Sequence, residues 1–201
     1  RQTYYSIDGE EYHLYTGPFT ITSDGIHTIS FYSIDLAGNK ESVKSLEVKI
    51  DKTKPVLNID APSGWQATPV IVKITAFDQT SGVKEIHCEL KEKGQVFTSS
   101  QAIEMNIGEE GVYTIECFVV DHASNNAEGQ VTVMIDLASP YTSATGVPSD
   151  WVNHDVKINL VPSDALSGVV ATYYCIDQID QCVPNIEGTT VVVTEEGLNY
   201  V

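Results

Sequence analysis

The chain has 201 residues, with 28 Asp or Glu against 11 Lys or Arg, and a formal net charge of -17. A surface this acidic repels nucleic-acid phosphates and anionic lipid headgroups, so we expect no nucleic-acid partner; divalent cations suit it better. No stretch approaches the roughly 20 apolar residues of a membrane-spanning helix, so we expect no membrane insertion.

Short segments recur along the chain at a spacing of 85 to 86 residues. TSDG at 22–25 is followed by GEEG at 108–111 and TEEG at 194–197, DLAGN from Asp35 recurs as DHASN from Asp121, and IDKTKP at 50–55 recurs as IDLASP at 135–140. SGV recurs at 81–83 and 167–169, and Trp65 recurs as Trp151. A fixed period is typical of repeat arrays. Its phase predicts the C-terminal part of a first repeat at 1–53, a complete second repeat at 54–138, and the N-terminal part of a third at 139–201.

The expected elements are short strands. In the first repeat, one strand contains Tyr5, and another contains His27 and Phe31 and leads to the Asp35 turn. In the second, apolar residues alternate over 70–74, 113–119 and 131–135, and EIHCEL at 85–90 is a further strand. Alternating runs broken by Gly, Pro, Asn and Asp are typical of a β-sandwich, and no segment has an amphipathic helical pattern.

The motifs DLAGN and IDKTKP, together with VKI.A.D..SGV after a Trp, resemble the immunoglobulin-like repeats of bacterial and archaeal cell-surface proteins. The resemblance covers essentially the whole chain. It implies an all-β fold of tandem immunoglobulin-like β-sandwiches, one complete and two incomplete, and a spacer in a secreted or anchored protein.

Four cysteines allow three pairings, which the repeat frame narrows. Cys88 and Cys117 fall on strands that are neighbours in a sandwich of this topology, and their counterparts in the first repeat are Tyr5 and Phe31. Cys175 and Cys182 flank IDQIDQ, which we expect to form a hairpin. We therefore expect bridges Cys88–Cys117 and Cys175–Cys182, and with them an oxidising, extracellular setting. The alternative is four free thiols in a reducing cell.

No nucleophile, zinc or phosphate-binding motif is present, and the same groups recur in every repeat, so we expect no enzymatic activity and no catalytic residues. His27 stands where the second repeat has Tyr113, which indicates packing or a corner hydrogen bond.

Aspartates from the loops and linkers should converge where repeats meet. We expect Asp51, Asp78, Asp121 and Asn125 to gather between the first and second repeats, with Asp24 approaching them. Asp136 and Asp164 should gather at the next junction, near Glu109 and Glu110. Loops of this composition suit calcium, which takes six to eight oxygen ligands. The alternative is that each Asp only caps its own turn.

These observations favour a non-enzymatic extracellular spacer, as part of a cell-surface, surface-layer or filament protein. Its partners would be neighbouring repeats or identical chains. We expect the chain to be an excerpt of a longer array; the alternative is a protomer whose incomplete repeats exchange strands. A competing hypothesis is an adhesin or glycan-binding module, since Tyr4, Tyr12, Tyr32 and other aromatic residues concentrate near the N-terminus.

Overall fold

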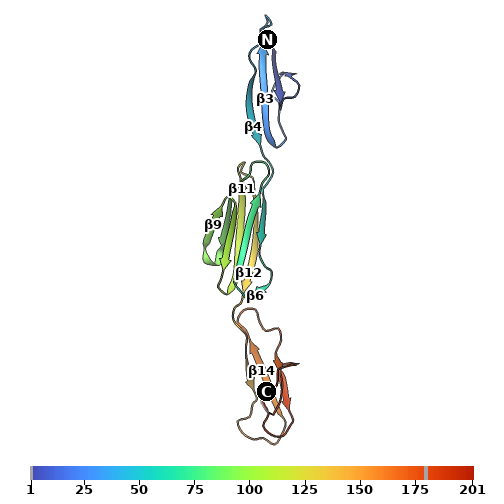
Figure 1. The fold of residues 1–201 in the computed structure, drawn as a ribbon, viewed down its shortest axis with the longest axis vertical. Helices are drawn as coiled ribbons and strands as arrows, with labels where there is room; N and C mark the ends of the chain where they lie inside the picture. The colour runs from blue at the N-terminus through green and yellow to red at the C-terminus, as the bar shows by residue number, and fades with distance from the viewer. Residues whose placement is uncertain (1, 179–180) are drawn as a thin grey trace. The chain divides into compact units, whose positions relative to one another are not determined.

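The computed structural model describes residues 2–178 and 181–201 and is all-β, as predicted (Figure 1). It divides into two compact units. One comprises Arg1–Pro62, Ile71–Asn106 and Tyr113–Val133, and the other Ser63–Val70, Ile107–Val112 and Met134–Val201. In the part of the chain that is described, no helix is long and apolar enough to cross a membrane.

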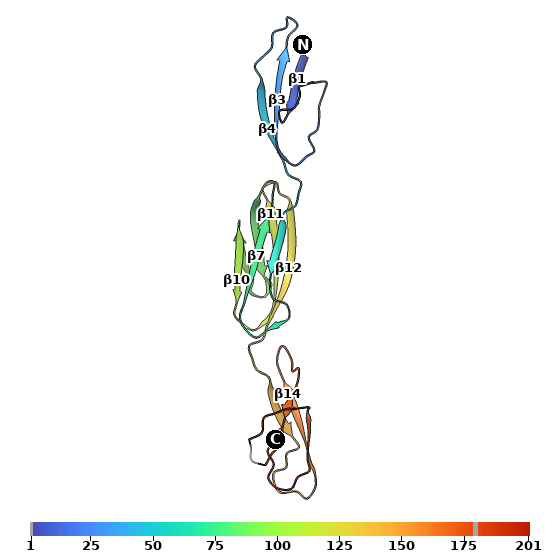
Figure 2. The same ribbon diagram turned by 45° about the vertical axis from the view of Figure 1, so that its right-hand side comes forward.

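The N-terminal sheet of the first unit has the order β2-β1-β3-β4. Its strands are β1 (Gln2–Ile7), β2 (His13–Leu14), β3 (Gly25–Ile34) and β4 (Lys44–Ile50), each antiparallel to its neighbours (Figure 2). Tyr5 pairs with Phe31 across β1 and β3, which places both side chains on one face.

The complete predicted repeat contains two sheets (Figures 1 and 2). The smaller has the order β10-β7-β5 and the larger β6-β12-β11-β8-β9, in which β6 runs parallel to β12. The strands of the smaller sheet are β5 (Val56–Asp60), β7 (Val70–Phe77) and β10 (Ala102–Ile107). Those of the larger are β6 (Trp65–Gln66), β8 (Val83–Leu90), β9 (Gln95–Ser99), β11 (Gly111–Asp121) and β12 (Asn126–Ile135), with a 3-10 turn, η1 (Lys91–Lys93), after β8.

The core of the first unit is built by the predicted alternation. Val72 and Ile74 of β7 are fully buried, and so are Ile115 and Val119 of β11, whereas Ile71 between the buried positions of β7 is exposed. A period of two sends one set of side chains into the space between two sheets and the other toward solvent. Burying each aliphatic side chain contributes roughly 1.5–3 kcal/mol to folding.

The second unit contains a three-stranded sheet, β13-β14-β17, and a short β15-β16 pair. The strands are β13 (Tyr141–Thr145), β14 (Val156–Ser163), β15 (Tyr173–Tyr174), β16 (Ile186–Glu187) and β17 (Thr190–Val193). Ile158 and Val191 lie opposite each other on β14 and β17, and both are buried.

Candidate functional site

The Asp35 turn after β3 is held by one carboxylate. Asp35 Oδ1 accepts hydrogen bonds from the backbone N–H groups of Ala37 (2.9 Å) and Asn39 (2.8 Å), and Oδ2 accepts one from Asn39 Nδ2 (2.9 Å). These bonds, led by that of the Asn39 side chain, lower the pKa of Asp35. Gly38 supplies the left-handed residue of the turn, with φ of 91°. The predicted turn cap is confirmed.

The Asp121 turn, 86 residues later, repeats this geometry. Asp121 Oδ1 accepts from the Asn125 backbone N–H and Oδ2 from Asn125 Nδ2, both at 2.8 Å. Ser124 takes the place of Gly38 and keeps the left-handed conformation, with φ of 74°. Asp121 is fully buried, unlike the exposed Asp35. Asn125 Nδ2 also donates to the backbone carbonyl of Asp51 at 3.2 Å, so this turn contacts the preceding linker.

Asp51 joins that linker to the loop at residues 78–83. Its Oδ1 accepts from the Thr53 backbone N–H and its Oδ2 from the Ser81 backbone N–H, both at 3.0 Å. The Ser81 side chain contributes most to lowering the pKa of Asp51, although the buried Ser81 Oγ makes no hydrogen bond of ordinary geometry. One carboxylate thus caps its own turn and holds the next loop.

Asp136 makes the same two contacts in the second unit. Its Oδ1 accepts from the Ala138 backbone N–H (3.1 Å) and its Oδ2 from the Ser167 backbone N–H (2.9 Å). Hydrogen bonds from Ser167 are the leading cause of the lowered pKa of Asp136. We call the Asp51–Ser81 and Asp136–Ser167 contacts the linker clamps.

Each clamp holds a loop that a further aspartate shapes. Asp78 Oδ1 accepts from the backbone N–H groups of Thr80, Ser81 and Gly82 at 3.1, 2.9 and 2.8 Å. Asp164 Oδ1 accepts from those of Leu166 and Gly168 at 3.0 and 2.7 Å. These bonds fix the loop so that its serine N–H points at the linker carboxylate.

Asp51, Asp78 and Asp121 form an acidic cluster, in which one carboxylate oxygen from each lies within 4.8 Å of the others. Asp121 is fully buried and the other two are half-buried. Within residues 2–178 and 181–201, no Lys, Arg or His forms an ion pair with any of the three. The cluster therefore concentrates negative charge next to a linker clamp.

The remaining predicted ligands are used in other ways. Asn125 was expected to offer an oxygen ligand. In the structure its Nδ2 donates a hydrogen bond to the Asp51 carbonyl oxygen, so the group that it directs at the linker is an N–H donor. Asp24 accepts from Thr53 Oγ1 (2.7 Å) and the Lys52 backbone N–H (3.2 Å), so it braces the same linker from the β3 side.

At the second junction Asp164 is among the groups that lower the pKa of Asp136, after Ser167. No group of three candidate ligands includes Glu109 or Glu110 among the residues that the structure describes.

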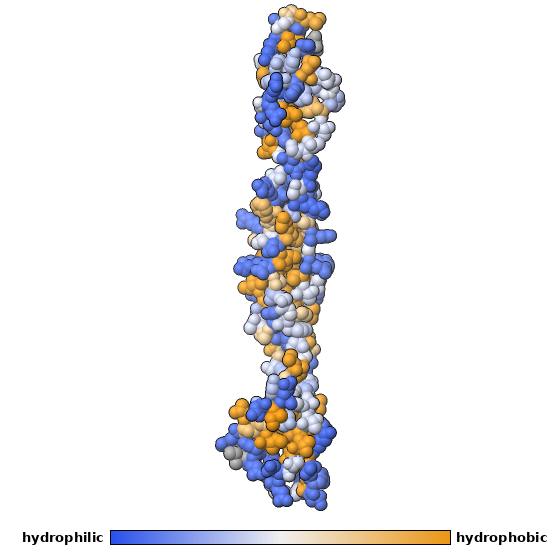
Figure 3. Space-filling view, turned by 90° about the vertical axis from the view of Figure 1, so that its right-hand side faces the viewer, coloured by the Kyte–Doolittle hydropathy of each residue, from blue (hydrophilic) through white to orange (hydrophobic). Residues whose placement is uncertain are grey.

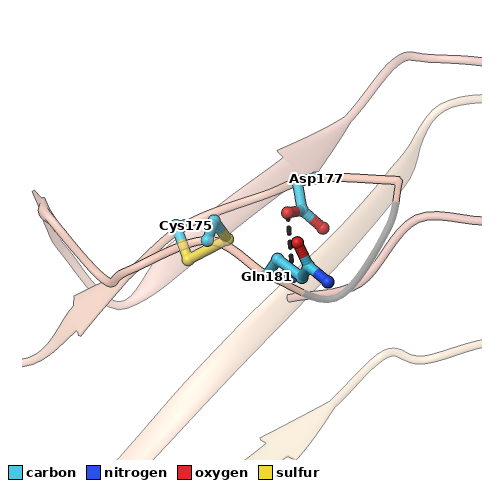
Figure 4. The surroundings of a disulfide bond; sticks show 4 residues. Cys175, Asp177 and Gln181 are labelled. Carbon is cyan, nitrogen blue, oxygen red and sulfur yellow. Dashed lines mark hydrogen bonds between the residues drawn. A yellow bond between two sulfur atoms is a disulfide. The ribbon is translucent and has the colours of Figure 1, made fainter.

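Both expected disulfides are present. Cys88 and Cys117 are register partners on β8 and β11 with a Cα–Cα distance of 4.1 Å, and both are buried. Cys175 and Cys182 are bridged at 6.2 Å beside the Gln181 N–H to Asp177 hydrogen bond of 3.0 Å (Figure 4). The hairpin expected between them includes residues 179–180, which lie outside the described residues.

His27 occupies the corner predicted for it. It is buried, and its Nδ1 lies 2.7 Å from Asp8 Oδ2 while its Nε2 lies 3.0 Å from the Ser23 carbonyl oxygen. With an acceptor at each nitrogen, the ring is held best as the doubly protonated cation, so the Asp8 hydrogen bond raises the pKa of His27.

Sequence reasoning did not identify the hydrogen-bond donors of the linker clamps, Ser81 and Ser167. Ser81 and Ser167 act through backbone N–H groups, which every residue except proline carries, so their identity gives no direct signal. The only available signal was the recurrence of SGV in phase with the linker aspartates.

Comparison with known protein families finds no matching family model, and no curated protein is significantly similar to the chain.

Proposed function

We propose that this chain is a non-enzymatic extracellular spacer, an array of immunoglobulin-like repeats in a cell-surface, surface-layer or filament protein. The observation that carries the proposal is the recurrence of the linker clamp at Asp51 and Asp136. A carboxylate that spans from a linker to the following loop restricts the linker, and a spacer needs restricted linkers.

The disulfides support the extracellular part of the proposal. Both bridges are local, with sequence separations of 29 and 7 residues, and the described residues contain no free cysteine. Disulfides of this kind persist in oxidising compartments and are rare in the reducing cytosol. Finding four alkylatable thiols in the native protein from its own cells would contradict this location.

Trypsin cleavage after Lys52 tests the clamp. The Lys52 side chain is exposed, and the residue lies next to Asp51 in the linker. A linker held at both ends resists proteolysis because cleavage requires local opening. We expect Asp51→Ala to accelerate cleavage after Lys52 severalfold, whereas Asp35→Ala, which removes a turn cap outside the linker, leaves it unchanged. Equal rates in all three proteins would refute the role of the clamp.

We also propose that the acidic cluster binds Ca²⁺. Three carboxylates within 4.8 Å repel one another, and Asp121 has no access to solvent that would screen its charge. A divalent cation relieves that repulsion, and the unsatisfied Ser81 Oγ adds an oxygen close by. The hydrogen bonds described above also explain each aspartate as a turn cap, so an experiment must separate the two roles.

Thermal unfolding with Ca²⁺ and with chelator makes that separation. A cation that binds only the folded state raises the midpoint in proportion to RT ln(1 + [L]/Kd). We expect millimolar Ca²⁺ to raise the midpoint in the natural chain, and to raise it less in Asp78→Asn. Superimposed curves with Ca²⁺ and with chelator would leave the aspartates as turn formers only.

The glycan-binding alternative has weaker support. Tyr32 stacks on Tyr4 with ring centroids 5.4 Å apart, Tyr12 lies against it at 5.0 Å, and Lys40 Nζ lies 3.7 Å from its ring centroid. Rings that contact one another in this way leave little open face for a sugar.

A further inference from the structure

An aromatic pair recurs at matching positions of two sheets. Tyr4 and Tyr32 are register partners on β1 and β3, and their rings stack with centroids 5.4 Å apart. His87 and Phe118 are register partners on β8 and β11, and their rings stack with centroids 4.7 Å apart. In the larger sheet a buried cysteine of the disulfide lies next to each of these residues, so alternation places the two rings on the opposite, outer face.

The outer face of the larger sheet is open to solvent. Phe118 is 41% exposed and His87 is half-buried. The smaller sheet, β10-β7-β5, lies against the inner face, where the core is, so it does not cover the two rings. Residues 56–135 supply both sheets, so this face and the core behind it belong to the interior of the sequence. Apolar side chains also reach the surface elsewhere among hydrophilic ones (Figure 3), so exposure alone does not mark a binding site.

A lysine of the chain itself occupies the aromatic pair of the N-terminal sheet. Lys40 Nζ lies 3.7 Å from the ring centroid of Tyr32, well within the roughly 6 Å range of a cation–π contact. Lys40 follows DLAGN, and Asn126 holds the corresponding position after DHASN. Within residues 2–178 and 181–201, no Lys or Arg lies over the ring of His87 or Phe118. The larger sheet therefore has the aromatic pair without the cation.

Carboxylates surround the aromatic pair of the larger sheet. Four glutamates of β8, β11 and β12 share the outer face by strand alternation: Glu85, Glu89, Glu116 and Glu128. Lys91 Nζ pairs with two of them, at 2.9 Å from Glu89 and 3.0 Å from Glu116. Glu85 and Glu128 are exposed, and neither forms an ion pair with a cationic group that the structure describes. Two negative charges thus remain unbalanced on the face that carries the rings.

We propose that the outer face of β8, β11 and β12 binds an arginine side chain presented by a basic segment of a partner protein. A guanidinium is planar, so it stacks on an aromatic ring and at the same time directs N–H groups at nearby carboxylates. Phe118 supplies the ring, held by its stacking on His87, and Glu85 and Glu128 supply the carboxylates. We call these four residues the aromatic platform.

The charge of the chain favours a basic partner over a second copy. The sequence has 28 Asp or Glu against 11 Lys or Arg, and a single arginine, Arg1. Two such chains repel each other, whereas a positively charged partner is attracted and oriented by the same field. The aromatic platform shares no residue with the acidic cluster, so the two sites can be tested separately.

A tetra-arginine peptide with blocked termini is the probe. It is titrated into the full, isotope-labelled chain at low ionic strength while the backbone amide signals are followed by NMR. We expect saturable shifts that are largest at the amides of residues 85–89 and 116–120. A tetra-citrulline peptide, which has nearly the same shape but no charge, should produce none.

Substitutions separate the platform from general attraction between opposite charges. Phe118→Leu keeps the charge of the face and should weaken peptide binding about threefold or more, because it removes the ring. Phe77→Leu, at an exposed position of the smaller sheet, should leave binding unchanged. Asn126→Lys places an ammonium where the N-terminal sheet has Lys40 and should also weaken binding. Thr132→Lys adds the same charge farther along the same face of β12 and should weaken binding less.

The remaining results would each overturn the proposal. Amide signals of β7 show that each variant keeps its fold. Absence of saturable shifts, equal affinity in the natural chain and Phe118→Leu, or equal weakening by Asn126→Lys and Thr132→Lys would leave only general charge attraction. Shifts that are largest at residues 78–82 would place the peptide on the acidic cluster instead. Shifts at residues 85–89 that grow with chain concentration in the absence of peptide would identify a second copy as the occupant.

Discussion

Removing the Cys88–Cys117 bridge should markedly lower the stability of the sheet that contains β8 and β11. The bridge closes a loop with a sequence separation of 29 residues. The chain-entropy relation gives about 3.5 kcal/mol for a loop of that length, against about 2.5 kcal/mol for the seven-residue separation of Cys175–Cys182. We therefore expect Cys88→Ala with Cys117→Ala to lower the free energy of unfolding by about 3.5 kcal/mol.

Urea unfolding followed by Trp65 fluorescence measures this loss. Trp151 is 83% exposed, so Trp151→Phe removes the second reporter with little structural effect. Trp65 lies in β6, which belongs to the same sheet as β8 and β11. The matched control is Cys175→Ala with Cys182→Ala in the same background. If removing the Cys88–Cys117 bridge lowers the free energy of unfolding by less than about 1 kcal/mol, the bridge does not stabilise the fold by restricting the conformational entropy of the unfolded chain.

Three further changes test local features. Ser124→Gly should stabilise the chain by about 1 kcal/mol in urea unfolding, because Gly relieves the positive φ; destabilisation would show that the Ser124 side chain matters more than its backbone. The Asp8–His27 ion pair should contribute to the free energy of unfolding between about pH 4 and 6.5. His27, with its raised pKa, contributes fully below 6.5 and loses its contribution as pH rises through the folded-state pKa, whereas Asp8, with its lowered pKa, contributes above 3.8 and loses its contribution as pH falls through the folded-state pKa. In the natural chain the unfolding midpoint should fall as the pH rises and His27 loses its proton. His27→Gln should lack this fall, and a pH profile unchanged by the substitution would contradict the role of the Asp8–His27 pair. Asp136→Ala should speed hydrogen exchange at the Ser167 amide, because the substitution removes the carboxylate that accepts from it. An unchanged exchange rate at Ser167 would contradict the clamp.

The sheets could be predicted because apolar alternation and the repeat period each involve many residues of the sequence. Alternation places Val72 and Ile74 on one face of a strand, and the repeat frame places Cys88 and Cys117 on neighbouring strands; the structure buries the first pair and aligns the second in register. Each of these inferences rests on the pleat of a strand, which fixes the face of every side chain once one is assigned. The gathering of Asp51, Asp78 and Asp121 followed from the topology of the loops.

Sequence reasoning was weaker where backbone atoms or side-chain orientation decide the contact. The Ser81 N–H that meets Asp51 has no residue signature. The direction of the Asn125 amide depends on the Asp121 carboxylate, which takes the same Nδ2 that reaches the linker.

The linker clamps have a consequence for how such chains diversify. Asp51 and Asp136 each accept a hydrogen bond from a main-chain N–H of the following loop, and every residue except proline can supply such a donor. In the array that we propose, a main-chain contact of this kind would persist when the side chains of the following loop change. Duplication or deletion of whole repeats in such an array would then preserve the linker clamps, so the length of the array could vary independently of them.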